Sequence, residues 1–212
     1  MNLKIDFASH EAASYACRNW HYSKCMPAGA NVKFGVWEDD KFIGCVIFAL
    51  GANRNISRLH GKTAELSRVA LTTHQSTVTR IISICLKKLK DFCPKLKSVI
   101  SYADLDRHEG IIYKAGNWLE EETTYRPWIK IHGKDVHQRS AFAKYTTGSV
   151  EWLKKNVDPN AHYIQNKGKK RFVWFYDKKK RALSKDSVVS GFQSEEGGAN
   201  PTNAPQKQVK NA

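Results

Sequence analysis

The chain has 212 residues, of which 41% are hydrophobic, and a formal net charge of +15. That size and composition allow one ordinary domain with a sizeable core, and no apolar run approaches the ~20 residues of a membrane-spanning helix. The first residues lack the basic, apolar and small-residue order of a signal peptide. The five cysteines include no C-x-x-C pair, which favours reduced cysteines in a cytoplasmic protein over disulfides or a zinc site.

The N-terminal part predicts a strand, a helix and a hairpin. Alternating apolar residues indicate a strand over residues 3–7, and Ser9 is suited to cap a helix that runs to about Asn19. Residues 20–24, Trp-His-Tyr-Ser-Lys, form a polar and aromatic cluster before a loop. Two β-rich runs, 32–37 and 42–50, flank an acidic turn and predict a hairpin. The polar and basic residues 51–62 predict a surface loop.

The next segment predicts a strand followed by a long helix. In the strand over residues 64–71, Arg68 lies among apolar neighbours and therefore needs an anionic partner or exposure. Ser76 is suited to cap the helix that follows. Apolar residues from Val78 to Phe92 recur at offsets of 0, 3, 4, 7, 11 and 14, which places them in one stripe on this helix.

Residues 98–118 carry the most informative pattern. An apolar run over residues 99–102 predicts a buried strand that ends at Asp104, and the apolar residues from Ile111 to Trp118 are spaced for one face of a helix. A carboxylate at the carboxyl end of a buried strand, just before a helix, lies where open α/β sheets place their chemistry. Aspartate is equally suited to cap a turn, so the stretch alone leaves both roles open for Asp104.

The remaining elements complete a mixed sheet. Residues 125–132 and 172–176 predict strands, 133–136 a turn, and 150–156 a short amphipathic helix. Because a hairpin joins antiparallel strands, the sheet cannot be wholly parallel. Residues 184–212 have no hydrophobic period, so we expect a folded domain over 1–183 and a disordered tail over 184–212. There is no G-x-G-x-x-G or Walker loop.

Positive charge is concentrated near the end of the expected domain. Residues 167–181 hold eight Lys or Arg residues and one acidic residue, Asp177. Such an excess attracts polyanions, above all nucleic acid, although a solvated basic surface has the same composition. With double-stranded DNA as the partner, the candidate phosphate contacts are Arg54, Arg58, Lys62, Lys169, Lys170, Arg171, Lys178, Lys179, Lys180 and Arg181.

Six stretches that cover most of residues 12–176 resemble the Mom family of phage DNA-modification proteins. They are ACRNWHYSKCMP (16–27), KFGVWEDDKFIGCVIF (33–48), ELSRVAL (65–71), SYAD (101–104), HEGIIYKAGNW (108–118) and VEWLKKNVDPNA (150–161). The resemblance implies an α/β (α+β) fold similar to the GCN5-related N-acetyltransferases, with a mixed, largely antiparallel sheet flanked by helices. It also implies conversion of adenine in double-stranded DNA to N6-carbamoylmethyladenine, which protects phage DNA from restriction enzymes in the bacterial cytoplasm.

The same resemblance implies a set of functional residues. The catalytic positions would be His21, Tyr22, Arg68, Asp104 and Tyr113, with the last protonating a leaving thiolate. The family is associated with bound iron, and the implied ligands are His21, Tyr22 and Asp104; imidazole and carboxylate suit ferrous iron, whereas a phenolate is less usual. From the residues alone, His21 and Tyr22 also fit a packed turn, Arg68 an ion pair with Glu65, and Tyr113 the core.

The donor is less well defined. N-acetyltransferases of this fold carry a Gln/Arg-x-x-Gly-x-Gly/Ala loop for the pantetheine–pyrophosphate of acetyl-CoA, but the corresponding stretch, THQSTVTR, contains no glycine. Hydroxyl groups at a helix N-terminus still suit an anion, so acetyl-CoA and another activated donor both remain open. The candidate donor-binding residues are Val69, Leu71, Ser76, Thr77 and Thr79.

Three classes of function therefore remain: a Mom-type DNA adenine-modifying transferase, an ordinary N-acyltransferase acting on a protein or small amine, and a non-enzymatic DNA-binding protein. The missing glycine loop and the high charge count against the second class, and the third leaves SYAD and WHYS unexplained. An adenine methyltransferase lacks its Asp/Asn-Pro-Pro-Tyr/Phe motif here. The sequence leaves open whether the protein forms a homodimer.

Overall fold

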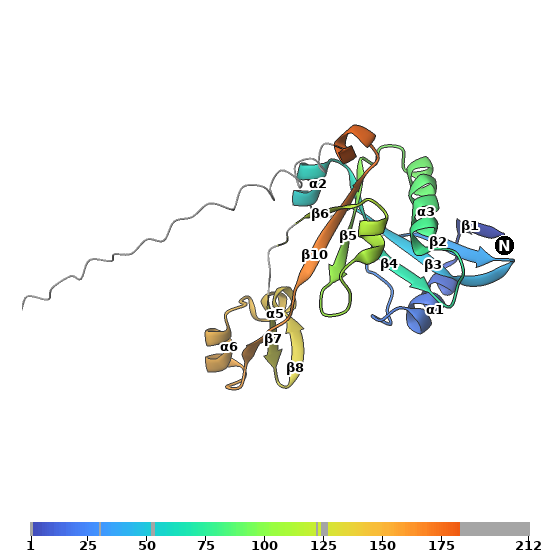
Figure 1. The fold of residues 1–212 in the computed structure, drawn as a ribbon. Coiled ribbons are helices and arrows are strands. Elements are labelled where there is room, and N and C mark those ends of the chain that lie inside the picture. Colours follow the sequence, from blue (N-terminus) through green and yellow to red (C-terminus); the bar gives the residue numbers. More distant parts are fainter. Residues whose placement is uncertain (1, 30, 52–53, 122, 124–126, 183–212) are drawn as a thin grey trace, which may run out of the picture.

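A seven-stranded sheet forms the centre of the molecule (Figure 1). The computed structural model describes residues 2–29, 31–51, 54–121, 123 and 127–182. In spatial order the strands are β1 (Leu3–Phe7), β2 (Asn31–Glu38), β3 (Lys41–Leu50), β4 (Thr63–Leu71), β5 (Ser98–Asp104), β10 (Lys169–Phe175) and β6 (Leu119–Glu121). Every neighbouring pair is antiparallel except β4 and β5. The mixed, largely antiparallel sheet is therefore confirmed.

Helices cover both faces of this sheet. Ile47 and Phe48 are successive residues of β3 and point to opposite faces. Phe48 belongs to the large core that contains the buried residues of α3 (Val78–Phe92) and Tyr113 of α4 (Ile111–Ala115). Ile47 packs with α1 (His10–Trp20). A third cluster holds Ile100 and α2 (Arg54–His60), and the preceding residue, Val99, lies in the large core. Helices α1 and α2 therefore share the face opposite α3 and α4.

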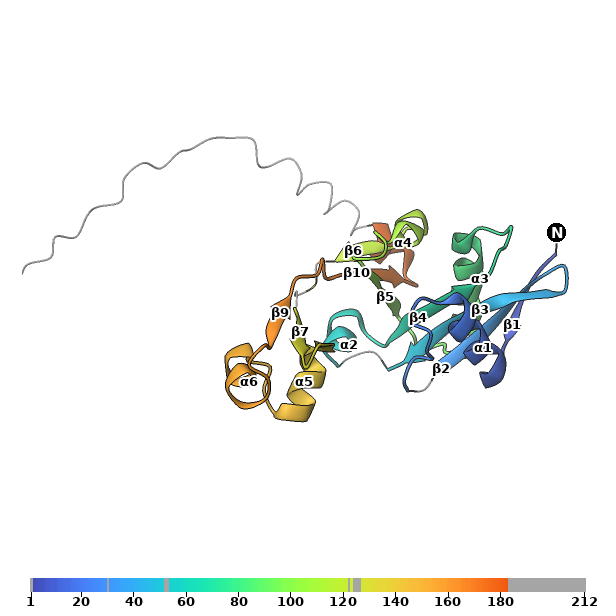
Figure 2. The ribbon, with the colours of Figure 1, turned by 90° about the horizontal axis from the view of Figure 1, so that it is seen from below.

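A small unit lies between β6 and β10 in sequence and has a core of its own. It contains a sheet in the order β8-β7-β9 and two short helices, and its apolar cluster includes Ile129 and Leu153. Figure 2 shows the unit on the left, next to the start of β10. The elements are β7 (Trp128–Ile131), β8 (Lys134–His137), α5 (Gln138–Tyr145), α6 (Val150–Asn156) and β9 (His162–Ile164).

Local signals account for several element boundaries. Ser9 caps α1, because its side chain accepts a hydrogen bond from the Ala12 N–H at 3.1 Å. The predicted hairpin forms between β2 and β3, and its turn residues Asp39 and Asp40 both have positive φ values, of 45° and 64°. Such a two-residue turn matches the twist of paired strands.

Other expectations are wrong. Residues 54–60 form the helix α2 rather than a loop, and its inward residues are Ile56 and His60. Helix α4 is short: Ile111 is 70% exposed, and Trp118 lies beyond the helix end. Thr77, not Ser76, occupies the N-cap of α3. The predicted strand over 125–132 begins at Trp128, and most of the predicted turn over 133–136 is β8. The tail, 184–212, lies outside the described residues.

The two parallel strands separate at the centre of the sheet. Pairing of β4 with β5 stops at Glu65 and Ile100, although β4 continues to Leu71 and β5 to Asp104. A bulge lies in β4 at this point, because the β3 partners step from Leu66 directly to Arg68. A bulge increases strand twist and often re-aims side chains next to functional sites. The diverging ends of β4 and β5 therefore leave strand edges to which other groups have access.

Candidate functional site

The loop after α1 is fastened to β4 by Arg68. The guanidinium donates through Nε to the Cys25 carbonyl oxygen at 3.3 Å, and its Nη2 lies 4.0 Å from Cys25 Sγ. A further hydrogen bond joins Nη1 to the Ser67 carbonyl oxygen at 2.7 Å. Among the described residues, no ion pair joins Arg68 to Glu65, which was one of the two roles that the sequence left open for this residue. Arg68 therefore positions residues 21–25 over the point where β4 and β5 separate.

His21 is buried and neutral at neutral pH. Only 8% of its surface is exposed. Its Nδ1 atom accepts a hydrogen bond from the Ser23 N–H at 3.1 Å and lies 2.8 Å from Ser23 Oγ. Because Nδ1 accepts, the proton of the neutral ring is on Nε2. Burial, with help from neighbouring positive groups, lowers the pKa of His21 to about 4. Those groups, in order of effect, are Arg68, His108, Arg107 and Lys24.

A chain of contacts joins this loop to the end of β5. The rings of His21 and Tyr22 lie 4.3 Å apart, and the Arg107 guanidinium lies 4.7 Å from the centre of the Tyr22 ring. Arg107 Nε in turn lies 3.6 Å from Asp104 Oδ2. Asp104 also accepts a hydrogen bond from the Asp106 N–H at 3.3 Å. Three of the predicted catalytic residues are thus brought together through Arg107, which sequence reasoning did not select.

Glu65 adds a second carboxylate to this face. It lies on β4 opposite Ile100 of β5, one residue before the pairing of the two strands ends. Burial raises the pKa of Glu65, and the positive charges of Arg68 and Lys169 act in the opposite direction. Burial likewise raises the pKa of Tyr102, with a contribution from Glu65. A half-buried carboxyl group with a raised pKa is typical of functional sites.

Tyr113 reaches the same region from the opposite face of the sheet. Its ring stacks on Phe172 with centroids 5.0 Å apart. The hydroxyl lies 2.8 Å from Ser101 Oγ, which donates to the Leu66 carbonyl oxygen at 2.7 Å. The phenol is therefore held between β5 and the bulged part of β4. Burial raises its pKa, and Tyr22 and Glu65 contribute in the same direction. Tyr113 is therefore both a core residue and a part of the candidate site.

The cluster does not fit the iron site implied for His21, Tyr22 and Asp104. A histidine ligand binds metal through one ring nitrogen and usually donates from the other, whereas His21 accepts at Nδ1 and keeps its proton on Nε2. The surrounding positive groups oppose a further cation. Among the described residues, no group of three His, Cys, Asp or Glu side chains is arranged to hold a metal ion. No step of the mechanism below therefore uses iron.

The candidate donor-binding residues lie on two neighbouring segments. Val69 and Leu71 pair with β3 beyond the separation of β4 from β5. In the loop before α3, the N–H groups of Gln75 and Ser76 both donate to the carboxylate of Glu38. Thr77 makes no capping hydrogen bond, and the hydroxyls of Thr77 and Thr79 lie 3.3 Å apart. A cavity of about 320 Å³ beside Arg80, Trp118 and Trp174 lies on the α3 and α4 face, away from His21.

Most candidate DNA contacts gather at one end of the molecule. Arg54 and Arg58 are exposed on α2, Lys62 follows that helix, and Lys178 to Lys180 are exposed after β10. Helix α2 packs on the end of β10, since Ile56 and Phe175 share a cluster and the His60 and Phe175 rings lie 5.4 Å apart. Arg181 instead lies over the Trp174 ring, 4.5 Å from its centre.

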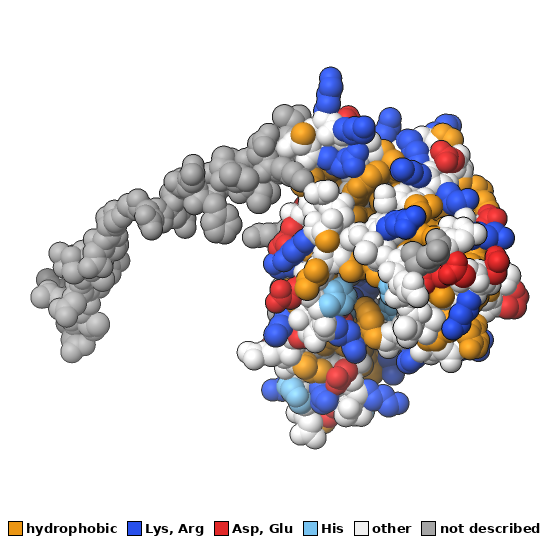
Figure 3. All heavy atoms as spheres, turned by 45° about the vertical axis from the view of Figure 1, so that its right-hand side comes forward, with side chains coloured by type: hydrophobic (Ala, Val, Ile, Leu, Met, Phe, Trp, Pro, Cys, Tyr) orange, Lys and Arg blue, Asp and Glu red, His pale blue; other side chains and the backbone are white. Residues whose placement is uncertain are grey.

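The basic residues at the start of β10 have different surroundings. Arg171 is 17% exposed and contacts Glu121 Oε2 through Nε and Nη2, each at 2.8 Å. Lys170 forms an ion pair with Glu120. Lys169 is exposed and lies opposite Asp104 in the register of β10 and β5. Of these three candidates, Lys169 is therefore the one whose place favours a contact with DNA at the site. Figure 3 shows basic side chains (blue) spread over one face of the molecule.

The chain resembles known proteins in sequence and in structure. A sequence model of the Mom protein family matches residues 2–190. No curated protein matches the chain. Among solved structures, a spermidine N-acetyltransferase from Vibrio cholerae is 12% identical with a TM-score of 0.48, over 82% of this chain and 93% of that one. A Bacillus subtilis acetyltransferase in complex with CoA is 9% identical with a TM-score of 0.46, over 83% of this chain and 100% of that one.

Proposed function

This chain belongs to the Mom protein family, and on that premise we propose that it modifies adenine in double-stranded DNA, converting the N6 amine to the carbamoylmethyl form and so protecting the DNA from restriction enzymes. One structural observation supports this proposal most directly. His21 and Tyr22, from the loop after α1, meet Asp104, from the end of β5, through a single side chain, Arg107. Segments far apart in sequence thus supply an aromatic ring, a neutral imidazole and a carboxylate to one surface.

The acceptor is a base that has left the helical stack. Adenine N6 is paired inside the duplex, so an enzyme that reacts with it must flip the nucleotide out. Tyr22, in the loop after α1, is 48% exposed. The guanidinium that lies over its ring belongs to Arg107, which is also exposed. We place the flipped base on Tyr22, where stacking contributes about 1–3 kcal/mol. In this arrangement the Arg107 guanidinium leaves the Tyr22 ring and contacts a DNA phosphate.

Proton removal is the chemical problem at N6. The lone pair of this amine is delocalised into the ring, so reaction with an electrophilic carbon requires the loss of a proton. Asp104 lies at the edge of the cluster with 23% of its side chain exposed, and we assign it as the acceptor of that proton. We assign the Nε2–H of His21 as a hydrogen-bond donor to a ring nitrogen of adenine. Glu65 and Tyr113 lie deeper, where β4 and β5 separate.

The donor side is assigned to that separation. A reacting carbon that enters between β4 and β5 meets Glu65 from β4 and the hydroxyl of Tyr113. Tyr113 then supplies a proton to the leaving group. This role requires the phenol to be protonated, and burial raises its pKa in agreement with that requirement. N6 forms its new bond to the methylene carbon of a carbamoylmethyl unit, and the bond from that carbon to the donor's leaving group breaks. Acetyl transfer from acetyl-CoA itself would give N6-acetyladenine, so the carbon unit comes from another activated small molecule.

The positive surroundings of the cluster favour a polyanionic substrate. Arg68, Arg107 and Lys24 all act on His21, and exposed Lys169 lies across from Asp104. Such surroundings attract DNA phosphates and repel a cationic amine, the acceptor that an ordinary N-acyltransferase on lysine side chains or polyamines would need. The electrostatics therefore support DNA as the acceptor over the alternative reaction.

Nucleoside mass spectrometry tests the proposal. DNA from cells that express the full chain is digested, and modified adenosine is measured relative to total adenosine. We expect N6-carbamoylmethyl deoxyadenosine with the wild-type chain and none with a vector control. If the wild-type protein is folded and abundant but leaves adenine unmodified, the proposed function is wrong. Acetylated protein or amine in the same cells would favour the ordinary acyltransferase instead.

A further inference from the structure

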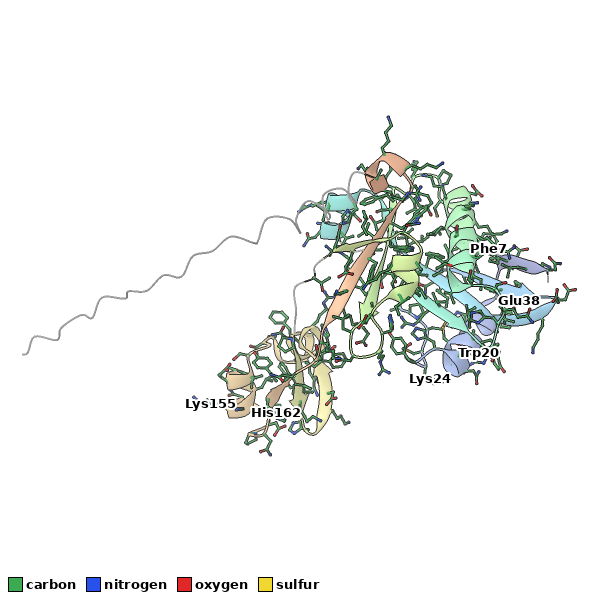
Figure 4. All side chains as sticks on the ribbon, viewed as in Figure 1. Phe7, Trp20, Lys24, Glu38, Lys155 and His162 are labelled. Carbon is green, nitrogen blue, oxygen red and sulfur yellow. The ribbon has the colours of Figure 1, made fainter. Side chains whose placement is uncertain are left out.

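The loop before α3 already holds an anion from within the chain. The N–H of Gln75 donates to Glu38 Oε2 at 2.9 Å, and the N–H of Ser76 donates to Glu38 Oε1 at 2.6 Å. The Ser76 hydroxyl also binds this carboxylate. Glu38 is the last residue of β2 and is only 9% exposed; Figure 4 labels it at the hairpin of β2 and β3. These three donor groups and the carboxylate form one closed arrangement, which we call the Glu38 clasp.

The clasp lies in the loop immediately before α3. Backbone N–H groups before a long helix, together with its dipole, form a natural anion site. Helix α3 has 15 residues, and its N-cap Thr77 makes no side-chain capping hydrogen bond. The N–H groups of Gln75 and Ser76 immediately precede this N-cap, and the carboxylate of Glu38 accepts from both, so a diphosphate cannot use them while the clasp holds.

The clasp is fixed from both sides. On the hairpin side, the N–H of Asn2 donates to Asp39 Oδ1 at 2.6 Å and the N–H of Asp39 donates to the Asn2 carbonyl oxygen at 2.9 Å. On the loop side, the N–H of Thr72 donates to the Ile43 carbonyl oxygen at 2.9 Å. Both segments that carry the clasp are therefore held in place by backbone hydrogen bonds. If the Glu38 carboxylate moved away from the two amides, it would lose its hydrogen bonds while nearly buried, which is costly.

We propose that Glu38 permanently occupies the N–H groups of Gln75 and Ser76 in the loop before α3, so that the donor of this enzyme is not anchored there through a diphosphate. The inference rests on the proposed function for the existence of a donor. It defines the donor as a molecule whose reacting group reaches the separation of β4 and β5 without phosphate contacts to Gln75 and Ser76. The hydrogen bonds also lower the pKa of Glu38, so an arriving phosphate would meet a like charge.

Hydrogen exchange of the full chain tests the clasp at single amides. We compare the wild type, Glu38→Ala and Asp40→Asn by NMR, each alone and with millimolar CoA. Asp40→Asn removes the same charge two residues away, and asparagine tolerates the positive φ at this turn. We expect slow exchange at Gln75 and Ser76 in the wild type and in Asp40→Asn, and exchange faster by about tenfold or more in Glu38→Ala. Glu38→Gln replaces Glu38→Ala if the latter does not fold.

CoA decides between a permanent clasp and a displaceable one. With a permanent clasp, CoA leaves the exchange of Gln75 and Ser76 unchanged in the wild type, whether or not it binds elsewhere. A change in exchange at both amides on saturable CoA binding, with tighter binding by Glu38→Ala, would overturn the inference, as would unaltered exchange in Glu38→Ala. The adenine modification assay is independent of these readouts, so failure of the proposed function leaves the exchange result interpretable.

Discussion

Asp104 is the residue whose removal most directly tests the chemistry. Its carboxylate ends β5, contacts Arg107 and is assigned the N6 proton. We expect Asp104→Asn to lower modification by at least about 100-fold, the usual contribution of a positioned proton acceptor, because the amide keeps the shape but is not a base. The measurement is modified adenosine per total adenosine in DNA from expressing cells.

The neighbouring aspartate provides the control for this prediction. Asp106 is exposed and accepts a hydrogen bond from the Lys167 N–H at 3.1 Å, which an asparagine also accepts. Asp106→Asn carries the same change of charge and is expected to modify DNA normally. Circular dichroism of both variants controls for folding. Modification by Asp104→Asn close to the wild-type level would remove this carboxylate from the mechanism.

The depressed pKa of His21 predicts a pH dependence of stability. Its pKa is about 4 in the folded chain and about 6.5 in the unfolded chain. Between these values the unfolded state binds the additional proton, so the free energy of unfolding falls as pH falls from about 6.5 to 4. Two and a half pKa units correspond to on the order of 3 kcal/mol as an upper value.

Urea unfolding from pH 4.5 to 7.5 measures this contribution. The neutral variant His21→Gln is expected to lose part of the slope, because its side chain does not titrate. The stability of the two proteins should therefore converge towards low pH. Parallel curves for wild type and variant over the whole range would show that His21 does not titrate as the structure implies.

At the scale of elements, Glu121 joins three of them. It pairs with Arg171 of β10 in two contacts of 2.8 Å, and its other oxygen lies 3.2 Å from Nε2 of His60 on α2. The side chains of Arg171 and His60 are 17% and 7% exposed. This arrangement gives Arg171 a structural role at the edge of the sheet, although the sequence marks it as a candidate DNA contact.

Arg171→Ala separates the two roles. Removing one partner of a largely buried ion pair leaves the other charge uncompensated, so we expect a loss of about 2–3 kcal/mol in the free energy of unfolding. The adjacent Lys170→Ala breaks a more exposed pair and is expected to cost less than about 1 kcal/mol. Urea denaturation compares them. A stable Arg171→Ala variant with weakened DNA binding would instead support the phosphate contact.

For the whole molecule, β10 separates two basic regions. The site region contains Lys24, Lys167 and Lys169, and the far region contains Lys178, Lys179 and Lys180. Seven residues of β10 at ~3.3 Å each place the regions about 23 Å apart along the strand, or roughly seven base-pair steps. One duplex is therefore long enough to contact both.

Two triple alanine variants test this arrangement. Replacing Lys178, Lys179 and Lys180 is expected to weaken binding to any DNA sequence and to flatten the slope of log affinity against log salt by roughly 1 to 3 units, about 0.9 per lost contact. Replacing the site region has the same effect on the slope and also lowers modification at saturating DNA. An unchanged slope in the first variant would mean that Lys178, Lys179 and Lys180 keep the chain soluble but do not contact DNA.

The wider architecture follows from local patterns in the sequence. The apolar stripe of α3 has a period that only a helix satisfies. It packs in or against the large core as expected, except for Phe92, which is 55% exposed. The acidic turn between two β-rich runs indicates the hairpin of β2 and β3, because the turn and the alternation are both local. Helix α2 escapes detection since its buried apolar residue is Ile56 alone, and one residue shows no period.

The candidate site could be predicted only in part from the sequence. The sequence by itself determined the mixed sheet and most of its strands and helices, and the family resemblance predicted a functional role for His21, Tyr22, Arg68 and Asp104. Only the tertiary structure decided that Arg107 joins them, that the amides before α3 belong to Glu38, and that His21 keeps its proton on Nε2. These contacts are decided by strand register and by burial of charge, which depend on the whole packed chain and leave no periodic trace in any one segment.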